Sequence, residues 1–377
     1  MRIVHFLLGR CNPDSANGVD KTVYHLSKAQ AMLGHDVAVF SITAKPAIPI
    51  DRVTVKTYSP EKPPIRLPRG LVEDLLEWKP DVAHLHSVYI PQNAILAKHL
   101  QSWGIPYVVT PNGGLSPYVL RRRWYLKVAY KLLVERPYLN RAAFIHAVTD
   151  QTDIRDYGVK VPIVVAPNGI DLALIPDDLN PNAIVNRFPN LEGKRIFLFL
   201  GRLDAFHKGL DLLLHGFQKS LKDTSAVLVL VGPDWRGHRR QLEKLAQGLG
   251  ITSQIFFLGP AYGKEKFDLL ASADVFVHTS RWEGASFSVL EALACGKPCL
   301  LTQAADPTGL IEQQGAGVVV QPNVEDIARG FQEMAALDLS ELRTMGSKGR
   351  TMVELEFNWE RIARTLTKAY LSYAVSK

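Results

Sequence analysis

The chain has 377 residues, 47% of them hydrophobic and 21% charged, which is enough to build two ordinary globular domains. No apolar run approaches the ~20 residues of a membrane-spanning helix, which excludes a helical membrane protein. A formal net charge of +7 predicts anionic partners such as nucleotides, lipid diphosphates, membrane surfaces or nucleic acids. Three scattered cysteines, Cys11, Cys295 and Cys299, offer no disulfide framework and predict a reduced, cytoplasmic protein.

Short strand patterns alternate with helical patterns in the first half of the chain. Residues 1–10 are expected to contain a first strand rather than a signal peptide, because the apolar run is short and no small-residue cleavage site follows it. Further strands are predicted at 36–42, 81–85 and 107–110, with helices at 23–33, 71–76 and 95–103. This alternation is typical of βαβ units and a parallel sheet.

His84 and His86 lie on one face of a predicted strand, a spacing that is compatible with a metal ion. No third ligand is evident nearby, and the sequence contains no Asp-x-Asp pair of the kind that holds a nucleotide-bound cation. Structural histidines are therefore favoured, and neither a metal nor another cofactor is expected.

A second alternation begins after Asn168. Its strands are predicted at 196–200, 226–231, 255–258, 275–278 and 298–302, with helices at 238–249 and 288–295 between them. The linker is expected near 166–171, before a polar, proline-containing stretch. The sequence thus predicts an α/β fold of two doubly wound parallel-sheet domains, 1–166 and 167–359, with a ligand cleft at the carboxyl ends of the strands.

Two cations follow one strand exit in the second half. Arg202 comes directly after the strand at 196–200, and Lys208 follows six positions later. Cleavage of a nucleotide-sugar bond leaves a diphosphate whose charge must be held by a metal or by fixed positive groups. Arginine offers a planar fork to phosphate and lysine a compact charge, although each residue alone also fits a solvated surface.

Two glutamates separated by seven residues, Glu283 and Glu291, form the stronger pattern. Ser288 is the expected N-cap of the following helix, so its first N–H groups would point at an anion. Glu291, in the expected first turn, would reach ribose hydroxyls, and Glu283 would reach the sugar from the loop. The alternative for Glu291 is an acid that only complements the helix dipole.

These residues, with the segments 201–210 and 291–298, resemble retaining family 4 glycosyltransferases, the glycosyl transferases group 1, which have the GT-B fold. The resemblance extends to 168–171 and 357–361 and so spans nearly the whole chain. It implies that the first domain binds the acceptor and the second binds the nucleotide-sugar donor. It also implies that a terminal helix at about 360–377 crosses back to complete the first domain.

The resemblance assigns roles to individual residues. It implies that Arg202 and Lys208 bind the donor diphosphate, that Glu283 binds the transferred sugar and that Glu291 binds the ribose. Backbone contacts to sugar, phosphate or nucleobase are expected from Gly18, in a loop before a helix beginning near Lys21, and from Ala285, Ser286, Phe287, Ser288, Val289, Gly232 and Pro260.

Asn112 stands at a strand exit where many relatives carry a histidine near the reacting sugar. Asparagine can donate or accept a hydrogen bond but cannot act as a general base at neutral pH. A retaining, same-face attack tolerates this, because the leaving phosphate oxygen takes the acceptor proton. Catalysis would then depend on positioning and electrostatics.

A basic stretch in the first domain begins with Arg121, Arg122, Arg123 and Trp124. It fits either a contact with anionic lipid headgroups or a lipid-linked acceptor, or else a solvated helix face. Nucleic-acid binding is disfavoured because no recognised module accompanies the charge.

The sequence therefore predicts a retaining, metal-independent hexosyltransferase that uses a UDP-sugar, with UDP-glucose favoured. Its acceptor would be a hydroxyl of a glycan or lipid-linked molecule in polysaccharide, exopolysaccharide or glycolipid assembly. A GDP-mannose or UDP-N-acetylhexosamine donor fits the same motifs. The rivals are a sugar-nucleotide 2-epimerase and a non-catalytic scaffold, and a peripheral position on the inner face of a membrane is an option beside a cytoplasmic one.

Overall fold

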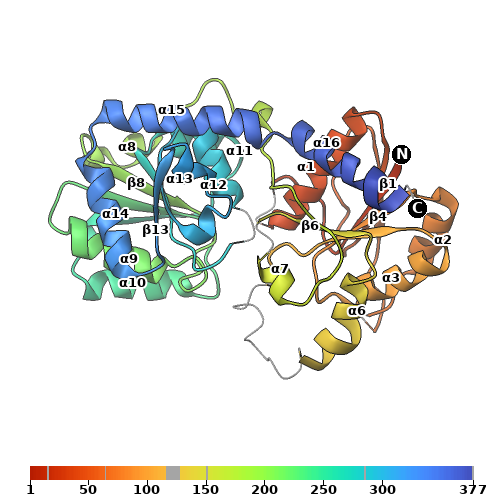
Figure 1. Cartoon of the computed structure of the whole chain (residues 1–377). Helices are drawn as coiled ribbons and strands as arrows, with labels where there is room; N and C mark the ends of the chain where they lie inside the picture. Colours follow the sequence, from red (N-terminus) through yellow and green to blue (C-terminus); the bar gives the residue numbers. More distant parts are fainter. Residues whose placement is uncertain (15–16, 64, 116–127, 150–151, 284–285, 376–377) are drawn as a thin grey trace. The chain divides into compact units, whose positions relative to one another are not determined.

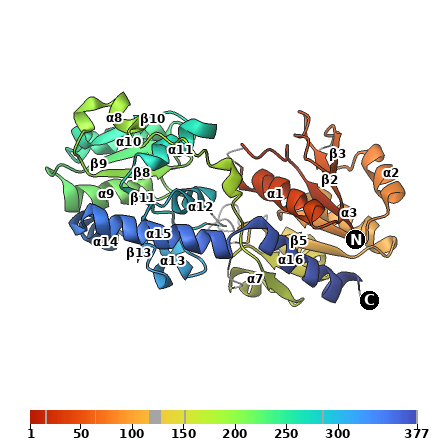
Figure 2. The same ribbon diagram turned by 90° about the horizontal axis from the view of Figure 1, so that it is seen from above.

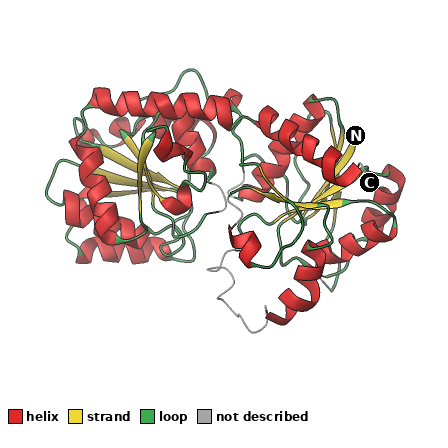
Figure 3. Cartoon of the chain, in the orientation of Figure 1, coloured by secondary structure: helices red, strands yellow, loops and turns green. Residues whose placement is uncertain are grey.

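The computed structural model describes residues 1–14, 17–63, 65–115, 128–149, 152–283 and 286–375. They form two compact units (Figures 1 and 2). Unit 1 combines Met1–Gly169 with the chain from Trp359 onward, and unit 2 is Ile170–Asn358. Each unit is a parallel β-sheet with helices packed over it (Figure 3), which confirms the predicted α/β architecture. Among the described residues, no helix is both long and apolar enough to cross a membrane.

The described strands of unit 1 form a parallel sheet in the order β3-β2-β1-β4-β5-β6-β7. The strands are β1 (Arg2–Leu7), β2 (Asp36–Ile42), β3 (Val53–Tyr58), β4 (Val82–His86), β5 (Tyr107–Thr110), β6 (Phe144–Ala147) and β7 (Ile163–Val165). The helices are α1 (Gly18–Met32), α2 (Arg69–Trp78), α3 (Pro91–Ser102), α6 (Arg136–Leu139), α7 (Thr152–Asp156) and α16 (Trp359–Tyr370), with a π-helical turn at Lys131–Glu135.

Unit 2 has a parallel sheet in the order β10-β9-β8-β11-β12-β13. Its strands are β8 (Ile196–Leu200), β9 (Val227–Val231), β10 (Ile255–Leu258), β11 (Val275–His278), β12 (Cys299–Thr302) and β13 (Gly317–Val320). Its helices are α8 (Ala183–Arg187), α9 (Leu210–Leu221), α10 (His238–Gly248), α11 (Gly263–Ala271), α12 (Phe287–Ala294), α13 (Leu310–Gln313), α14 (Val324–Ala336) and α15 (Leu339–Glu356).

The central strands are buried and largely apolar because helices cover both faces of each sheet. β9 reads Val-Leu-Val-Leu-Val, and all five of its residues are buried. In unit 2, one hydrophobic cluster contains Leu198 and Val229, and a second, on the opposite sheet face, contains Phe197 and Leu228. The strand order reverses between β1 and β4 in unit 1 and between β8 and β11 in unit 2, and such switch points are where open parallel sheets bind ligands.

Helix α16 returns late in the chain to pack against α1 in unit 1. The ring of Trp359 stacks on His25, with centroids 5.6 Å apart and an interplanar angle of 14°. Tyr370, fully buried, places its hydroxyl 2.7 Å from Nδ1 of His84 in β4. The last helix therefore contributes to the core of the first unit.

Candidate active site

The candidate site lies in unit 2, at the carboxyl ends of β8 and β11. The loop after β8 ends at Gly209, which has a left-handed φ of 62° and where a Cβ would lie 2.0 Å from the Thr279 carbonyl oxygen. The Thr279 hydroxyl donates a 3.1 Å hydrogen bond to the Gly209 carbonyl. Only glycine fits this close approach, which brings loop 201–209 against the end of β11.

Arg281, in the loop after β11, binds residues of the loop after β8. Its guanidinium makes a bidentate ion pair with Asp211, with both N···O distances 2.7 Å, and donates to the Phe206 carbonyl at 2.7 Å. Its backbone N–H donates to the His207 carbonyl at 3.0 Å. Because the Arg281–Asp211 ion pair is bidentate and partly buried, it fixes the orientation of the Arg281 guanidinium as well as its distance from Asp211.

Lys208 and Glu283 form an ion pair between these loops. The Lys208 side chain is 12% exposed and that of Glu283 is 8% exposed. The Ser280 hydroxyl donates to the same glutamate oxygen, Oε1, at 3.2 Å. Burial by itself would raise the pKa of Glu283, but the Lys208 charge and the nearby histidines outweigh burial and hold this pKa well below its usual range. Glu283 is therefore ionised throughout the physiological range.

Arg202 lies on the same loop as Lys208, directly after β8. Its guanidinium lies 4.4 Å from the centre of the Trp235 ring, in the loop after β9. Among the described residues, no carboxylate forms an ion pair with Arg202. A ring face holds the guanidinium without neutralising its charge, so the charge stays available to an anion.

The start of α12 differs from the prediction. Ser286, not Ser288, is the N-cap, and Glu291 lies beyond the first turn. The Ser286 side chain makes no capping hydrogen bond, and its Oγ lies 3.1 Å from Ser288 Oγ. The Ser286 side chain therefore caps none of the first N–H groups of α12, and the N-terminus of a helix favours an anion. Ala285 lies outside the described residues.

Glu291 is almost fully buried and pairs with Lys266 of α11, with Nζ 2.7 Å from Oε1. The sequence analysis missed Lys266, because only the packing of α11 beside α12 brings the two together. The alternative that Glu291 merely complements the helix dipole loses its support, since the residue is not in the first turn. Its contact with a ribose stays a prediction.

Gly232 and Pro260 lie at the ends of the neighbouring strands β9 and β10. A Cβ on Gly232, whose φ is 149°, would lie 1.8 Å from the Gly201 carbonyl oxygen. The Gly232 N–H donates to the Gly259 carbonyl at 3.2 Å. The loops after β8, β9 and β10 are thus packed backbone against backbone, and the nucleobase contact predicted there stays a prediction.

In unit 1, Gly18 is the first residue of α1 rather than part of the preceding loop, because Asn17 caps the helix by accepting from the Val19 N–H at 3.2 Å. The helix therefore starts earlier than the predicted position near Lys21. Asn112 follows β5 with a left-handed φ of 51° and donates to the Thr110 carbonyl at 3.2 Å. Its catalytic role stays a prediction. The residues Arg121, Arg122, Arg123 and Trp124 lie outside the described part of the chain.

The expectation that no third ligand lies near His84 and His86 is wrong. Parallel pairing of β1 with β4 places His5 beside His84, and the candidate ligand atoms of the three histidines lie within 4.8 Å of one another. Both ring nitrogens of His84 are nevertheless engaged, by the hydroxyls of Tyr370 at 2.7 Å and Thr110 at 2.6 Å. The rings of His84 and His86 are stacked with their centroids 4.5 Å apart, and Nδ1 of His5 lies 3.0 Å from Nε2 of His86. The contacts fit a hydrogen-bonded core cluster.

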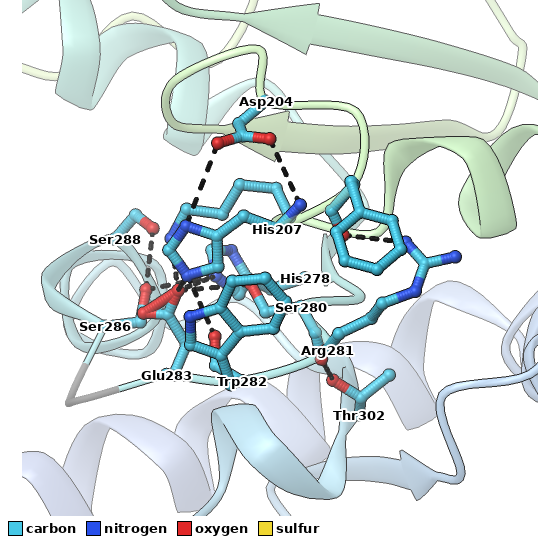
Figure 4. A network of polar contacts seen from close by, with 12 residues as sticks. Asp204, His207, His278, Ser280, Arg281, Trp282, Glu283, Ser286, Ser288 and Thr302 are labelled. Carbon is cyan, nitrogen blue, oxygen red and sulfur yellow. Dashed lines mark hydrogen bonds and ion pairs between the residues drawn. The ribbon is translucent and has the colours of Figure 1, made fainter. Parts of the chain in front are cut away.

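Further residues at the site of unit 2 escaped the sequence analysis (Figure 4). His278, the last residue of β11, and His207, just before Lys208, both face Glu283. Trp282 stacks on His207 with centroids 4.5 Å apart and an interplanar angle of 13°. The sequence offered one signal, for His278 alone, because this residue ends a predicted strand.

Two doubly wound sheets, with cations and a carboxylate at a switch point, define the class of GT-B glycosyltransferases. Residues 16–174 match Glycosyltransferase Family 4, and residues 182–352 match Glycosyl transferases group 1. The chain therefore carries two glycosyltransferase domains, which confirms the resemblance seen in its motifs.

Two relatives show how far the similarity reaches. The D-inositol 3-phosphate glycosyltransferase of Geodermatophilus obscurus is 32% identical over 221 residues, a match that covers 56% of this chain and 47% of that protein. The matched segment thus spans about half the length of that relative. The MMP alpha-(1->4)-mannosyltransferase of Mycolicibacterium hassiacum is 25% identical, and the match covers 98% of both chains.

Two solved structures share the fold over the whole chain. The sucrose-phosphate synthase from Thermosynechococcus elongatus superposes with a TM-score of 0.82 at 20% identity, covering 100% of both chains. Anabaena HepE, in complex with UDP and glucose, gives a TM-score of 0.76 at 18% identity, covering 99% of this chain and 100% of that one. At these identities the likeness establishes the GT-B fold.

Proposed function

We propose that this glycosyltransferase is a retaining, metal-independent hexosyltransferase that moves glucose from UDP-glucose to a hydroxyl of a glycan or lipid-linked acceptor. The observation that carries the proposal is the convergence of Arg202, Lys208 and Glu283 at the switch point of unit 2. Two cations held by fixed contacts can stabilise a diphosphate leaving group. The complex of HepE with UDP and glucose supports a UDP-sugar.

In the proposed reaction, the bond between the anomeric carbon and the donor phosphate oxygen breaks, and a bond to the acceptor oxygen forms on the same face. The acceptor proton passes to the departing phosphate oxygen. Lys208 and Arg202 stabilise the charge that develops on the diphosphate, while Glu283 holds the sugar. Most of the rate then comes from positioning and electrostatics, which agrees with the absence of a general base at Asn112.

A mannosyl donor is the second candidate. The full-length similarity to a mannosyltransferase favours it, because that match covers both chains almost completely. GDP-mannose would use the same two cations and the same glutamate, and only the loops around Gly232 and Pro260 would meet a different base. A UDP-N-acetylhexosamine donor would also fit the diphosphate contacts.

A thermal-shift screen tests the donor. The purified protein is heated with UDP, GDP, ADP, UDP-glucose, UDP-N-acetylglucosamine or GDP-mannose, with EDTA present throughout, since a ligand of the native state raises its stability. Stabilisation by the uridine compounds supports the proposal, and stabilisation by the guanosine pair supports the mannosyl donor. No shift across the panel would contradict a nucleotide-sugar site. Deuterium entering the donor sugar from solvent without an acceptor would indicate an epimerase.

Lys208→Ala and Arg202→Ala test the leaving-group contacts. Each is expected to lose about 2 to 4 kcal/mol of transition-state stabilisation, or about 30- to 900-fold in kcat/KM, as for other preorganised donors. Donor turnover is measured in a coupled assay for the released nucleotide diphosphate. Turnover at the wild-type rate in either variant would contradict the assignment.

We also propose a cytoplasmic location with peripheral contact to an anionic membrane. Three apolar side chains near the π-helical turn support this contact: Val128 is 44% exposed, Leu132 52% and Leu133 77%. Lys131 lies in the same turn. Basic and apolar side chains together favour the headgroup boundary. Cosedimentation with phosphatidylserine vesicles, but not with phosphatidylcholine vesicles, is the expected result, and Leu133→Ser should reduce it.

A further inference from the structure

Two histidines face the buried carboxylate of Glu283 in addition to Lys208 (Figure 4). Nε2 of His207 and Nε2 of His278 each lie 3.7 Å from Glu283 Oε1. These distances are too long for hydrogen bonds but short enough for a polar N–H or a protonated ring to act strongly on the carboxylate in a buried site.

His207 is held from several directions. Its backbone N–H donates to Asp204 Oδ1 at 3.1 Å, and its ring stacks on Trp282. Nε2 lies 3.0 Å from the Trp282 carbonyl oxygen. Because a carbonyl only accepts hydrogen bonds, Nε2 carries the hydrogen, so the positive edge of the ring lies beside Glu283.

His278 is fixed by the core. Its side chain is 0% exposed, and its ring lies parallel to Phe199, with centroids 5.5 Å apart and an interplanar angle of 19°. Nε2 also lies 3.4 Å from Ser286 Oγ, the N-cap of α12. Among the described residues, Nδ1 of His278 has no hydrogen-bond partner. This ring therefore connects the end of β11 to both Glu283 and the start of α12.

A diphosphate that binds Lys208 would compete with Glu283 for the ammonium group. The glutamate would then be a buried carboxylate that shares the one lysine that pairs with it among the described residues, a costly state unless other donors take over. We propose that His207 and His278 are positioning residues that keep Glu283 directed at the donor sugar when Lys208 turns to the diphosphate. This inference rests on the proposed donor site and assigns the two histidines to its sugar half.

The proposal predicts a selective effect on the sugar. Isothermal titration calorimetry compares UDP-glucose with UDP, and GDP-mannose with GDP, for the wild type, His207→Gln and His278→Gln. Each variant should bind the sugar nucleotide about tenfold more weakly, as expected for loss of an interaction with a charged group, and should bind the free nucleotide within about twofold of wild type. In steady-state assays, the KM for the sugar-nucleotide donor should rise in the same two variants.

The matched control is His215→Gln, a histidine of α9 outside both loops, which should change neither affinity. Equal weakening of sugar nucleotide and free nucleotide in the variants would overturn the proposal, because it would mean that the histidines only maintain the fold. So would unchanged affinities in folded variants. If thermal unfolding shows that His278→Gln does not fold, His207→Gln carries the test, since its side chain is 22% exposed. Failure of wild type to bind any nucleotide would instead refute the donor site itself.

Discussion

Lys208 and Glu283, 75 residues apart in the chain, form an ion pair whose two side chains are each at least 88% buried. Strand pairing alone does not explain this contact, since the pair also needs the Gly209 turn and the Arg281 clamp. The ion pair therefore links the loop after β8 to the loop after β11 within unit 2.

Removing only the lysine should destabilise the protein more than removing both charges. Lys208→Met leaves the buried Glu283 carboxylate without its lysine partner and is expected to lower the free energy of unfolding by about 3 kcal/mol, whereas Lys208→Met combined with Glu283→Gln should recover most of that loss. Thermal unfolding measures both. The control is Lys219→Met, which breaks an exposed pair with Glu325 (side chains 52% and 68% exposed) and should leave the unfolding midpoint nearly unchanged. Additive losses in the double variant would contradict the prediction.

Trp235 is expected to affect donor binding through its contact with the Arg202 guanidinium. Trp235→Leu removes the ring under the guanidinium and is expected to weaken donor binding by about 1 kcal/mol, or about fivefold in the donor KM, because Arg202 loses its preferred direction. Trp235→Phe keeps a ring face and serves as the control. Equal KM values for leucine and phenylalanine would mean that the stack has no part in binding.

Gly232 should not tolerate even a methyl group. Gly232→Ala places Cβ 1.8 Å from the Gly201 carbonyl oxygen in a strained backbone conformation and is expected to destabilise unit 2 by about 3 kcal/mol or more. Gly259→Ala, at the end of the next strand, meets no atom within 4 Å and is the matched control. Urea unfolding of the two variants should separate them clearly, and similar midpoints would show that the loops can move apart.

Low pH should lower the free energy of unfolding of unit 1 through two buried histidines, His5 and His146. Burial lowers the pKa of His5 and of His146 to about 4 from an ordinary value of 6.5. Between pH 4 and pH 6.5 the unfolded chain therefore binds more protons than the folded chain. The stability that depends on neutral His5 and His146 is complete above about pH 6.5 and is lost as the pH falls toward 4. The expected loss is on the order of a few kcal/mol per histidine.

Hydrogen exchange measures this within one molecule. Amides of β1 and β4, beside the histidines, should lose protection faster than those of β8 and β9 as the pH falls from 7 to 4.5, after correction for intrinsic rates. His146→Gln should flatten the dependence for β1 and β4, even if it lowers stability overall. An identical pH dependence in the two sheets would refute the role of the cluster.

Most central strands were visible in the sequence because they are largely apolar, even though His5, His84, His86 and His278 lie within them. β8 and β11 match their predicted ranges, and Arg202 was found because it follows β8, whereas Glu283 was found by its spacing from Glu291. β3, β6, β7 and β13 were not predicted. Three of them, β3, β7 and β13, are edge strands, and no residue of β3 is buried. Edge strands lack the second covered face that makes a run uniformly apolar.

Contacts between distant segments were beyond sequence reasoning. His5 joins His84 only through the register of β1 with β4, and Lys266 meets Glu291 only because α11 packs beside α12. The choice between Ser286 and Ser288 as N-cap also could not be made, because both residues have the same chemistry. Loop conformation decided it.

The return of α16 gives the chain an order of assembly. Unit 2 is one continuous segment, Ile170–Asn358, and contains all of its own strands, so it can close while the chain is still being synthesised. Unit 1 cannot finish at that stage, because Nδ1 of His84 meets its hydroxyl partner only when Tyr370 arrives. The half of the protein that is made first is thus the half that matures last.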